Sequence, residues 1–198
     1  APLLFLGFSG DPALQRRCAE NFIAASVPQM EKFPPRAPLE RASRQEDRIR
    51  IAYLSSDFQD HATAYLAAEL FERHDRSRFE VIGLSFGVND GSAMRARVSG
   101  AFDSFHDIAG MGDGAAADLL RRLKVDIAVD LKGHTHGARP AILCRRPCPV
   151  QVSYLGFPGT MGCDFIDYII ADEIVAPAEH AAFFSEKIVH LPGCYQVN

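Results

Sequence analysis

The chain has 198 residues, of which 47% are hydrophobic, and it carries a formal net charge of −4 with an isoelectric point near 6.0. This length suits one good-sized core, or one domain plus an arm. The mild negative charge argues against a nucleic-acid partner, and no apolar run approaches the roughly 20 residues of a membrane helix, so we expect no membrane partner.

The first part of the chain predicts a helix followed by a linker. The opening stretch APLLFLGFSG has a short apolar run without a basic lead, which does not fit a signal peptide. Asp11 can cap a helix over residues 11–25. From residue 27 to 47, four prolines and alternating charges are typical of a linker or wrapping arm. We therefore expect residues 1–47 to be a helix and Pro-rich linker, and residues 48–198 to form the main domain.

From residue 48 onward, apolar runs alternate with segments of helical character. The predicted strands are residues 49–54, 79–86, 125–131, 150–155 and 166–171, with a further short strand within 101–108. The predicted helices are residues 62–73, 93–100, 115–123 and 138–145. The strand segments are continuously apolar, which favours a parallel sheet covered on both faces. The sequence predicts an α/β fold: a Rossmann-like three-layer αβα domain with a mainly parallel sheet.

Functional side chains gather in the loops that follow three of the predicted strands. These loops read SSDFQDHAT, KGHTHGARP and GFPGTMG, whereas GVNDGS, after another strand, is an ordinary polar turn. Parallel strands of a doubly wound sheet end at one edge, and ligands bind outside that edge. We therefore expect His61, Thr135 and Pro158 to surround a shared hollow.

Several of these residues also have a simpler interpretation. Asp57 or Asp60 could cap the helix that follows, and His61 could be a capping or surface histidine. His134 and His136 form an H-x-H pair, but a metal site needs about three well-placed ligands. No further cluster accompanies the pair, so we expect no metal.

The GFPGTMG loop is at minimum a tight turn. Glycines also allow a backbone to approach a ligand closely, as diphosphate-binding loops require. The spacing matches neither a Walker loop nor G-x-G-x-x-G, so the loop alone gives little support to phosphate binding.

The cysteines indicate a reducing compartment. An odd number cannot pair completely within one chain, and the spacing matches no zinc signature. We expect reduced, mostly buried thiols and hence a cytoplasmic protein. The five residues concerned are Cys18, Cys144, Cys148, Cys163 and Cys194.

The segments RIRIAYLSSDFQDHATAYL, DIAVDLKGHTHGARP and RPCPVQVSYLGFPGTMGCDFIDYIIAD resemble the catalytic region of the O-linked N-acetylglucosamine (O-GlcNAc) transferase family. Spindly-type protein O-fucosyltransferases are close relatives of that family. The resemblance covers residues 48–198 well and extends more loosely to the N-terminal helix. It implies a GT-B architecture of two Rossmann-like halves, of which this chain is the N-terminal one.

The resemblance also implies an activity and partners. The expected reaction is inverting transfer of N-acetylglucosamine from UDP-GlcNAc to Ser or Thr hydroxyls of acceptor proteins, without a cofactor or metal. Upstream tetratricopeptide repeats and the C-terminal catalytic half of the same protein are the expected partners. Since that second half grips most of the nucleotide, the chain alone is expected to be inactive. Alternatives are GDP-fucose or UDP-glucose as donor, or a catalytically silent module that binds nucleotide sugars.

Particular residues match the family's functional positions. His61 matches a histidine that reaches the donor sugar and diphosphate, and Asp57 matches an acid proposed to assist proton transfer from the acceptor hydroxyl. Thr63 matches a threonine near the donor. His134 and Thr135 resemble the Spindly branch, and Ala62 replaces the family's usual proline. The other expected substrate-binding residues are His136, which replaces a lysine of the animal enzymes, and Leu155, Gly156, Pro158, Gly159 and Thr160 of the sugar pocket.

Overall fold

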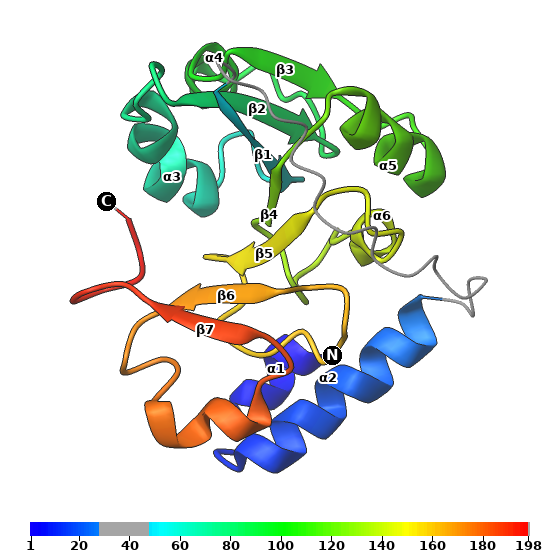
Figure 1. Ribbon diagram of the computed structural model, residues 1–198, viewed down its shortest axis with the longest axis vertical. Helices are drawn as coiled ribbons and strands as arrows, with labels where there is room; N and C mark the ends of the chain where they lie inside the picture. Colours follow the sequence, from blue (N-terminus) through cyan, green and yellow to red (C-terminus); the bar gives the residue numbers. More distant parts are fainter. Residues whose placement is uncertain (28–47, 198) are drawn as a thin grey trace.

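The computed structural model describes residues 1–27 and 48–197 (Figure 1). The predicted linker lies outside the described residues except for Val27. The helices are α1 Pro2–Leu6, α2 Pro12–Ser26, α3 Ala62–Glu72, α4 Ala93–Gly100, α5 Asp113–Arg122 and α6 Pro140–Leu143, with the 3₁₀ helix η1 Ala178–Phe183. The strands are β1 Ile49–Ser55, β2 Phe79–Ser85, β3 Ser104–Asp107, β4 Ile127–Asp130, β5 Val150–Tyr154, β6 Tyr168–Ala171 and β7 Lys187–His190.

The strands form one sheet in the order β3-β2-β1-β4-β5-β6-β7, and all neighbouring strands in it are parallel (Figure 1). The chain runs outward from β1 to β3 and then returns to place β4 on the other side of β1. The strand order therefore reverses between β1 and β4, where Leu54 lies opposite Asp130. In doubly wound sheets, ligands bind outside the carboxyl ends of the strands at such a reversal. The prediction of a parallel sheet is confirmed.

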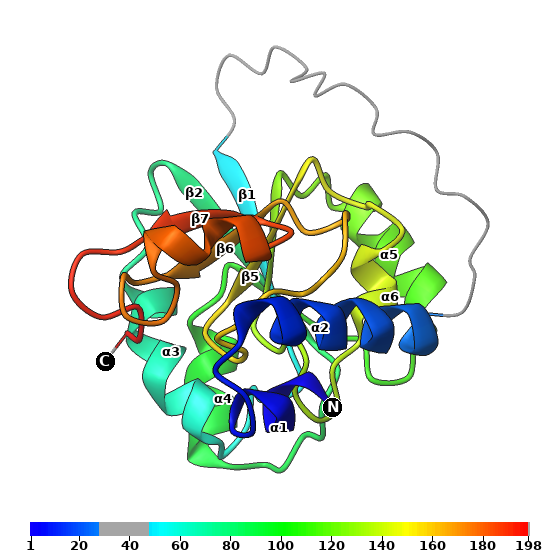
Figure 2. The same ribbon diagram turned by 90° about the horizontal axis from the view of Figure 1, so that it is seen from below.

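Both faces of the sheet are covered, which explains the continuous apolar runs. Leu54 of β1 belongs to a core that includes Leu120 of α5 and Ile142 of α6. Tyr53, the preceding residue, belongs to a second core with Phe71 of α3. Successive strand residues point to opposite faces, so β1 must be apolar at nearly every position. Figures 1 and 2 show α3 and α4 on one face and α5 and α6 on the other, which confirms the three-layer prediction.

The helix predicted over residues 138–145 is shorter than expected. Its observed bounds are Pro140–Leu143. Proline at the start fixes the first turn, because the residue before a proline disfavours helical geometry. Arg146 ends any continuation, since its φ of 47° lies in the left-handed region.

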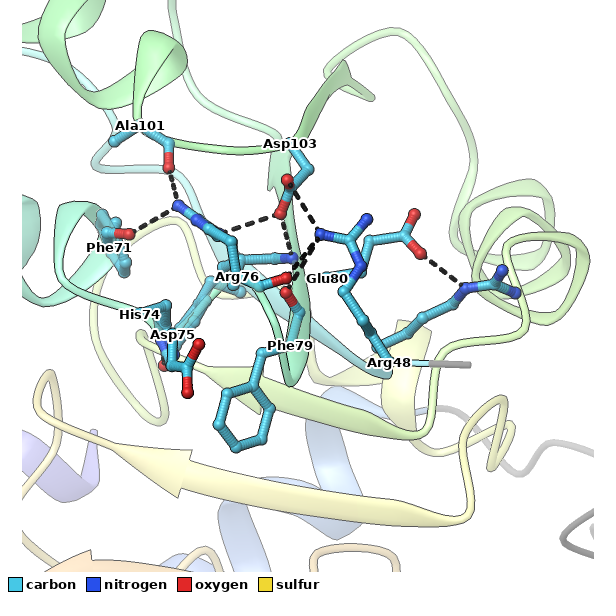
Figure 3. A network of polar contacts seen from close by, with 12 residues as sticks. Arg48, Phe71, His74, Asp75, Arg76, Phe79, Glu80, Ala101 and Asp103 are labelled. Carbon is cyan, nitrogen blue, oxygen red and sulfur yellow. Dashed lines mark hydrogen bonds and ion pairs between the residues drawn. The ribbon is translucent and has the colours of Figure 1, made fainter. Parts of the chain in front are cut away.

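The amino ends of β1 to β3 are joined by a polar network (Figure 3). Asp103 accepts hydrogen bonds from the Val81 amide at 2.7 Å and from Arg76 at 2.9 Å. Arg76 also donates to the carbonyl oxygens of Phe71 and Ala101. Partial burial opposes ionisation, but these donors hold the pKa of Asp103 below its usual value. This network stabilises the edge of the sheet opposite to the carboxyl ends.

Helix α2 packs directly against the sheet domain. Asp11 caps it as predicted, accepting from the amides of Ala13 and Leu14. A Cβ on Gly162 would lie 2.5 Å from the Glu20 nitrogen, so the loop after β5 approaches the helix backbone closely. Figure 2 shows α1 and α2 alongside this part of the domain. Within the described ranges, no helix has the length and apolar character needed to cross a membrane.

Candidate functional site

A cavity of about 670 Å³ lies at the reversal of strand order, where the loops after β1 and β4 meet. We call it the switch cavity. Helix α1 and the loops after β2 and β5 complete its wall. It is lined by Leu3, Ser56, Asp57, Gln59, His61, Thr63, Phe86, Gly87, Val88, Lys132, Thr135, His136, Gly137 and Gly156.

The wall of the switch cavity contains an ion pair between two loops. Lys132 Nζ, from the loop after β4, donates to Asp57 Oδ2 at 2.6 Å. The side chains are only 5% and 9% exposed, respectively. The other Asp57 oxygen accepts from the Ser56 hydroxyl at 3.0 Å, and the Asp57 amide donates to Ser55 Oγ. Because the pair is buried, salt screens it much less than it would an exposed pair.

His61 caps α3 and lines the cavity at the same time. Its Nδ1 accepts from the Thr63 amide at 3.2 Å, so the neutral ring carries its proton on Nε2. The same Nδ1 lies 3.6 Å from Asp57 Oδ2, and the side chain is 43% exposed. The helix cap therefore fixes the ring and leaves the Nε2–H group as its donor toward a ligand. Asp60, the alternative cap, does not cap the helix; its amide donates to Asp90.

The predicted residues of the loop after β4 have different roles. Thr135 and His136 both line the cavity, and His136 is exposed. The Thr135 hydroxyl donates to the Lys132 carbonyl at 2.9 Å, which closes the turn. Asp130 accepts from the amides of Lys132 and Gly133, and burial raises the pKa of its carboxyl above the usual value despite these bonds.

His134 does not line the switch cavity. Its Nε2 donates to the Met161 carbonyl at 2.9 Å, and its ring packs edge-on against Phe22 and Phe157. Burial lowers the pKa of this histidine and thereby favours the neutral ring. It lines a neighbouring cavity of about 630 Å³ between α1, α2 and the loop at 133–141. His136 lines both cavities, so only one member of the H-x-H pair reaches the switch cavity. No metal-binding cluster of His, Cys, Asp or Glu occurs in the part of the chain that the structure describes.

The turn after β5 contributes only Gly156 to the switch cavity. Leu155 is buried in the core and has a φ of 68°, a strained conformation for a residue with a side chain. A Cβ on Gly156 would lie 2.1 Å from the Leu131 carbonyl oxygen, so this position requires glycine. The bend at Leu155 therefore accompanies a close approach of Gly156 to the loop after β4.

Pro158, Gly159 and Thr160 line a smaller hollow beside α1 and η1 instead. Thr160 Oγ1 donates to Glu186 at 2.7 Å, and burial raises the pKa of that glutamate. The structure thus places His61 and Thr135 on one cavity, as expected, but Pro158 on another. The physical reason is the sharp bend at Leu155, which directs the rest of the turn toward α1.

Sequence reasoning missed Lys132, Ser56 and Gly87 as residues of the site. A Cβ on Gly87 would lie 1.8 Å from the Ser56 carbonyl oxygen, so this glycine lets the loops after β1 and β2 approach. The signal for Lys132 was its place directly after a buried strand. Its burial depends on Asp57, which is distant in sequence, and no local pattern reports that contact.

Comparisons with known proteins agree on one family. The profile of glycosyl transferase family 41 matches residues 18–198. The chain is 42% identical over 151 residues to a probable UDP-N-acetylglucosamine–peptide N-acetylglucosaminyltransferase SEC of Arabidopsis thaliana, covering 76% of this chain and 16% of the relative. It is 38% identical over 149 residues to the UDP-N-acetylglucosamine–peptide N-acetylglucosaminyltransferase of Caenorhabditis elegans, covering 75% of this chain and 13% of the relative.

A third relative, a probable UDP-N-acetylglucosamine–peptide N-acetylglucosaminyltransferase SPINDLY of Arabidopsis thaliana, is 33% identical over 153 residues, covering 76% of this chain and 17% of the relative. Among solved structures, a mutant of the Thermobaculum terrenum O-GlcNAc transferase matches with a TM-score of 0.83 and 27% identity, over 98% of this chain and 37% of that chain. The chain thus spans only a minor part of the length of each.

Proposed function

The chain belongs to glycosyl transferase family 41, and from that membership we propose that it supplies one wall of the active site of an inverting protein O-glycosyltransferase. The proposed donor is UDP-N-acetylglucosamine and the proposed acceptors are Ser and Thr hydroxyls of proteins. The observation that carries the proposal is the switch cavity, where His61 presents an Nε2–H group beside a buried Asp57–Lys132 ion pair. The names of the relatives support the choice of sugar.

In this proposal, His61 donates a hydrogen bond to the donor. Inverting transfer makes the anomeric carbon cation-like while the diphosphate leaves with negative charge. A preorganised donor aimed at the developing charge is worth roughly 100- to 1000-fold in rate. The His61 ring is preorganised, because the Thr63 amide holds Nδ1. Thr63, Thr135, His136 and Gly156 shape the wall around it.

The rest of the sugar pocket is proposed to lie partly beyond the switch cavity. In this proposal, His134 and Thr160 support the loops around the switch cavity through their hydrogen bonds to Met161 and Glu186. The same support comes from the rest of the turn after β5, namely Leu155, Pro158 and Gly159. A C-terminal half that completes a GT-B cleft and upstream tetratricopeptide repeats are proposed partners within the same protein. A cytoplasmic location is proposed, with support from the free thiols Cys18, Cys148, Cys163 and Cys194.

A second donor remains a candidate within the same chemistry. His134 and Thr135 resemble the Spindly branch, which favours GDP-fucose as the alternative, and UDP-glucose is a further one. A silent module that only binds nucleotide sugars is the alternative from another class. Release of UDP or GDP during incubation with each donor and an acceptor protein separates these candidates.

The decisive variant is His61→Ala in the full-length protein. We expect kcat with the preferred donor to fall at least roughly 100-fold while the fold is retained, because the lost group is a partly exposed side chain. His190→Ala is the matched control, since His190 lies on β7 and lines none of the three cavities described. Near-normal turnover of the His61→Ala protein would remove this residue from the mechanism.

A further inference from the structure

The Asp57–Lys132 pair bridges the two loops at the reversal of strand order. Asp57 follows β1 and Lys132 follows β4, and the 2.6 Å contact joins them within the cavity wall. Lysine is rarely buried unless it is paired. Each charge here depends on the other, because removing one partner leaves an uncompensated charge in a site with little access to water.

Both carboxylate oxygens of Asp57 already accept hydrogen bonds. One oxygen accepts from Ser56 and the other from Lys132. A proton on the second oxygen would neutralise Asp57 and leave the Lys132 ammonium group unpaired, with its side chain only 5% exposed. Asp57, which the family resemblance assigns to proton transfer, therefore already serves as the ion-pair partner of Lys132.

The same pair controls the ring of His61. The Asp57 oxygen that binds Lys132 lies 3.6 Å from His61 Nδ1. Nδ1 can either accept from the Thr63 amide or carry a proton for Asp57, but it cannot do both. An unpaired Asp57 carboxylate would favour the proton, whereas Lys132 offsets that charge and favours the neutral ring.

We propose that Lys132 is a positioning residue: through Asp57 it holds His61 in the neutral form, with Nδ1 on the Thr63 amide and Nε2–H toward the substrate. Asp57 is part of this scaffold and does not take the acceptor's proton. The inference rests on the proposed glycosyl transfer. The other titratable side chain on the cavity wall within the described residues is His136, which is exposed. Outside the lining, the Asp90 carboxylate accepts a hydrogen bond from the Asp60 amide.

The test compares Lys132→Met, Asp57→Asn and the double variant in the full-length protein, with kcat and KM measured across pH. Lys132→Met leaves Asp57 unpaired, so His61 gains a proton and turns from Thr63. We expect kcat near neutral pH to fall roughly 10- to 100-fold, with recovery as the pH rises and His61 loses that proton. The double variant carries neither charge, and we expect it to regain most of the lost kcat.

Other outcomes overturn the inference. If Asp57 were the general base, Asp57→Asn and the double variant would both remain inactive at every pH. A Lys132→Met profile parallel to the wild-type profile would show a merely structural lysine. The proposal predicts neither.

A second readout needs no donor and separates this inference from the proposed function. In full-length protein with ¹⁵N-labelled histidine, the His61 ring nitrogens report the site of the proton. We expect Nε2–H and an unprotonated Nδ1 near neutral pH in the wild type, and protonation of both nitrogens in Lys132→Met. An identical ring state in both proteins would contradict the role of Lys132, whether or not any transfer is detected.

Discussion

At the scale of single residues, His134 connects the N-terminal helix α2 to the loops after β4 and β5. Its ring packs against Phe22 of α2 and Phe157 of the turn after β5, and it is only 4% exposed. Burial lowers the pKa of this ring. The folded protein therefore binds a proton at His134 less readily than the unfolded chain does. The stability that results is present above the usual histidine pKa of about 6.5 and is lost as the pH falls through that value.

The prediction for His134 concerns the pH dependence of unfolding. We expect the free energy of unfolding of the wild type to fall more steeply between about pH 7.5 and 5.5 than that of His134→Phe. Phenylalanine keeps the ring packing but does not titrate, and its lost bond to Met161 lowers stability equally at both pH values. Urea denaturation of the full-length proteins gives the two slopes. Parallel slopes would mean that folding does not lower the pKa of His134.

At this scale, the sequence indicates His61 as a site residue but does not indicate Lys132. A histidine between a buried strand and a helix was a visible candidate, and the structure shows it as a helix cap that also lines the switch cavity. Its catalytic role stays a prediction. Lys132 was not a candidate, because a lysine after a strand is usually a surface residue. Its burial comes from a partner that only the fold brings near.

At the scale of elements, the turn after β5 determines the floor of the switch cavity. Leu155 adopts a φ of 68° and places its side chain in the core. The next residue then approaches the Leu131 carbonyl so closely that any side chain would collide with backbone atoms. Backbone atoms cannot rotate away as a flexible side chain can, so the collision must shift one of the two loops.

We predict that Gly156→Ala destabilises the protein by about 1–3 kcal/mol and also lowers turnover, because the loop that carries Lys132 has to move. Gly110→Ala is the control, since a Cβ at Gly110 meets nothing within 4 Å; we expect a change within about 0.5 kcal/mol there. Chemical denaturation and donor turnover measure the two effects. Equal stability of both variants would show that the loops yield without cost.

Element types were predictable where packing left a local pattern. The strands β1, β2, β4, β5 and β6 each lie within a few residues of the predicted runs, because burial on both faces demands continuous apolar sequence. Strand β7 was missed since three of its four residues are exposed at the sheet's edge, which leaves only a short apolar signal. Helix α1 and η1 were missed as well, and their short lengths give too few turns for a helical period.

At the scale of the whole molecule, the position of the site follows from strand order. The sequence indicated that three enriched loops lie at one edge, but it did not indicate which strands are neighbours. The order places β4 directly beside β1 and β5 one strand further away. The loops after β1 and β4 therefore meet across the reversal and supply most of the lining. Neighbourhood in a sheet depends on long-range pairing, which local sequence does not encode.

The central claim is that the switch cavity holds the sugar donor against His61. Calorimetric titration of the full-length protein with UDP-N-acetylglucosamine, GDP-fucose and UDP-glucose tests it most directly, for the wild type, His61→Ala and His190→Ala. We predict binding of one nucleotide sugar by the wild type and by His190→Ala, with affinity weakened roughly tenfold in His61→Ala, as the loss of one hydrogen bond to a charged group implies. Equal affinity of the wild type and His61→Ala, or no binding of any of the three donors, would contradict the claim.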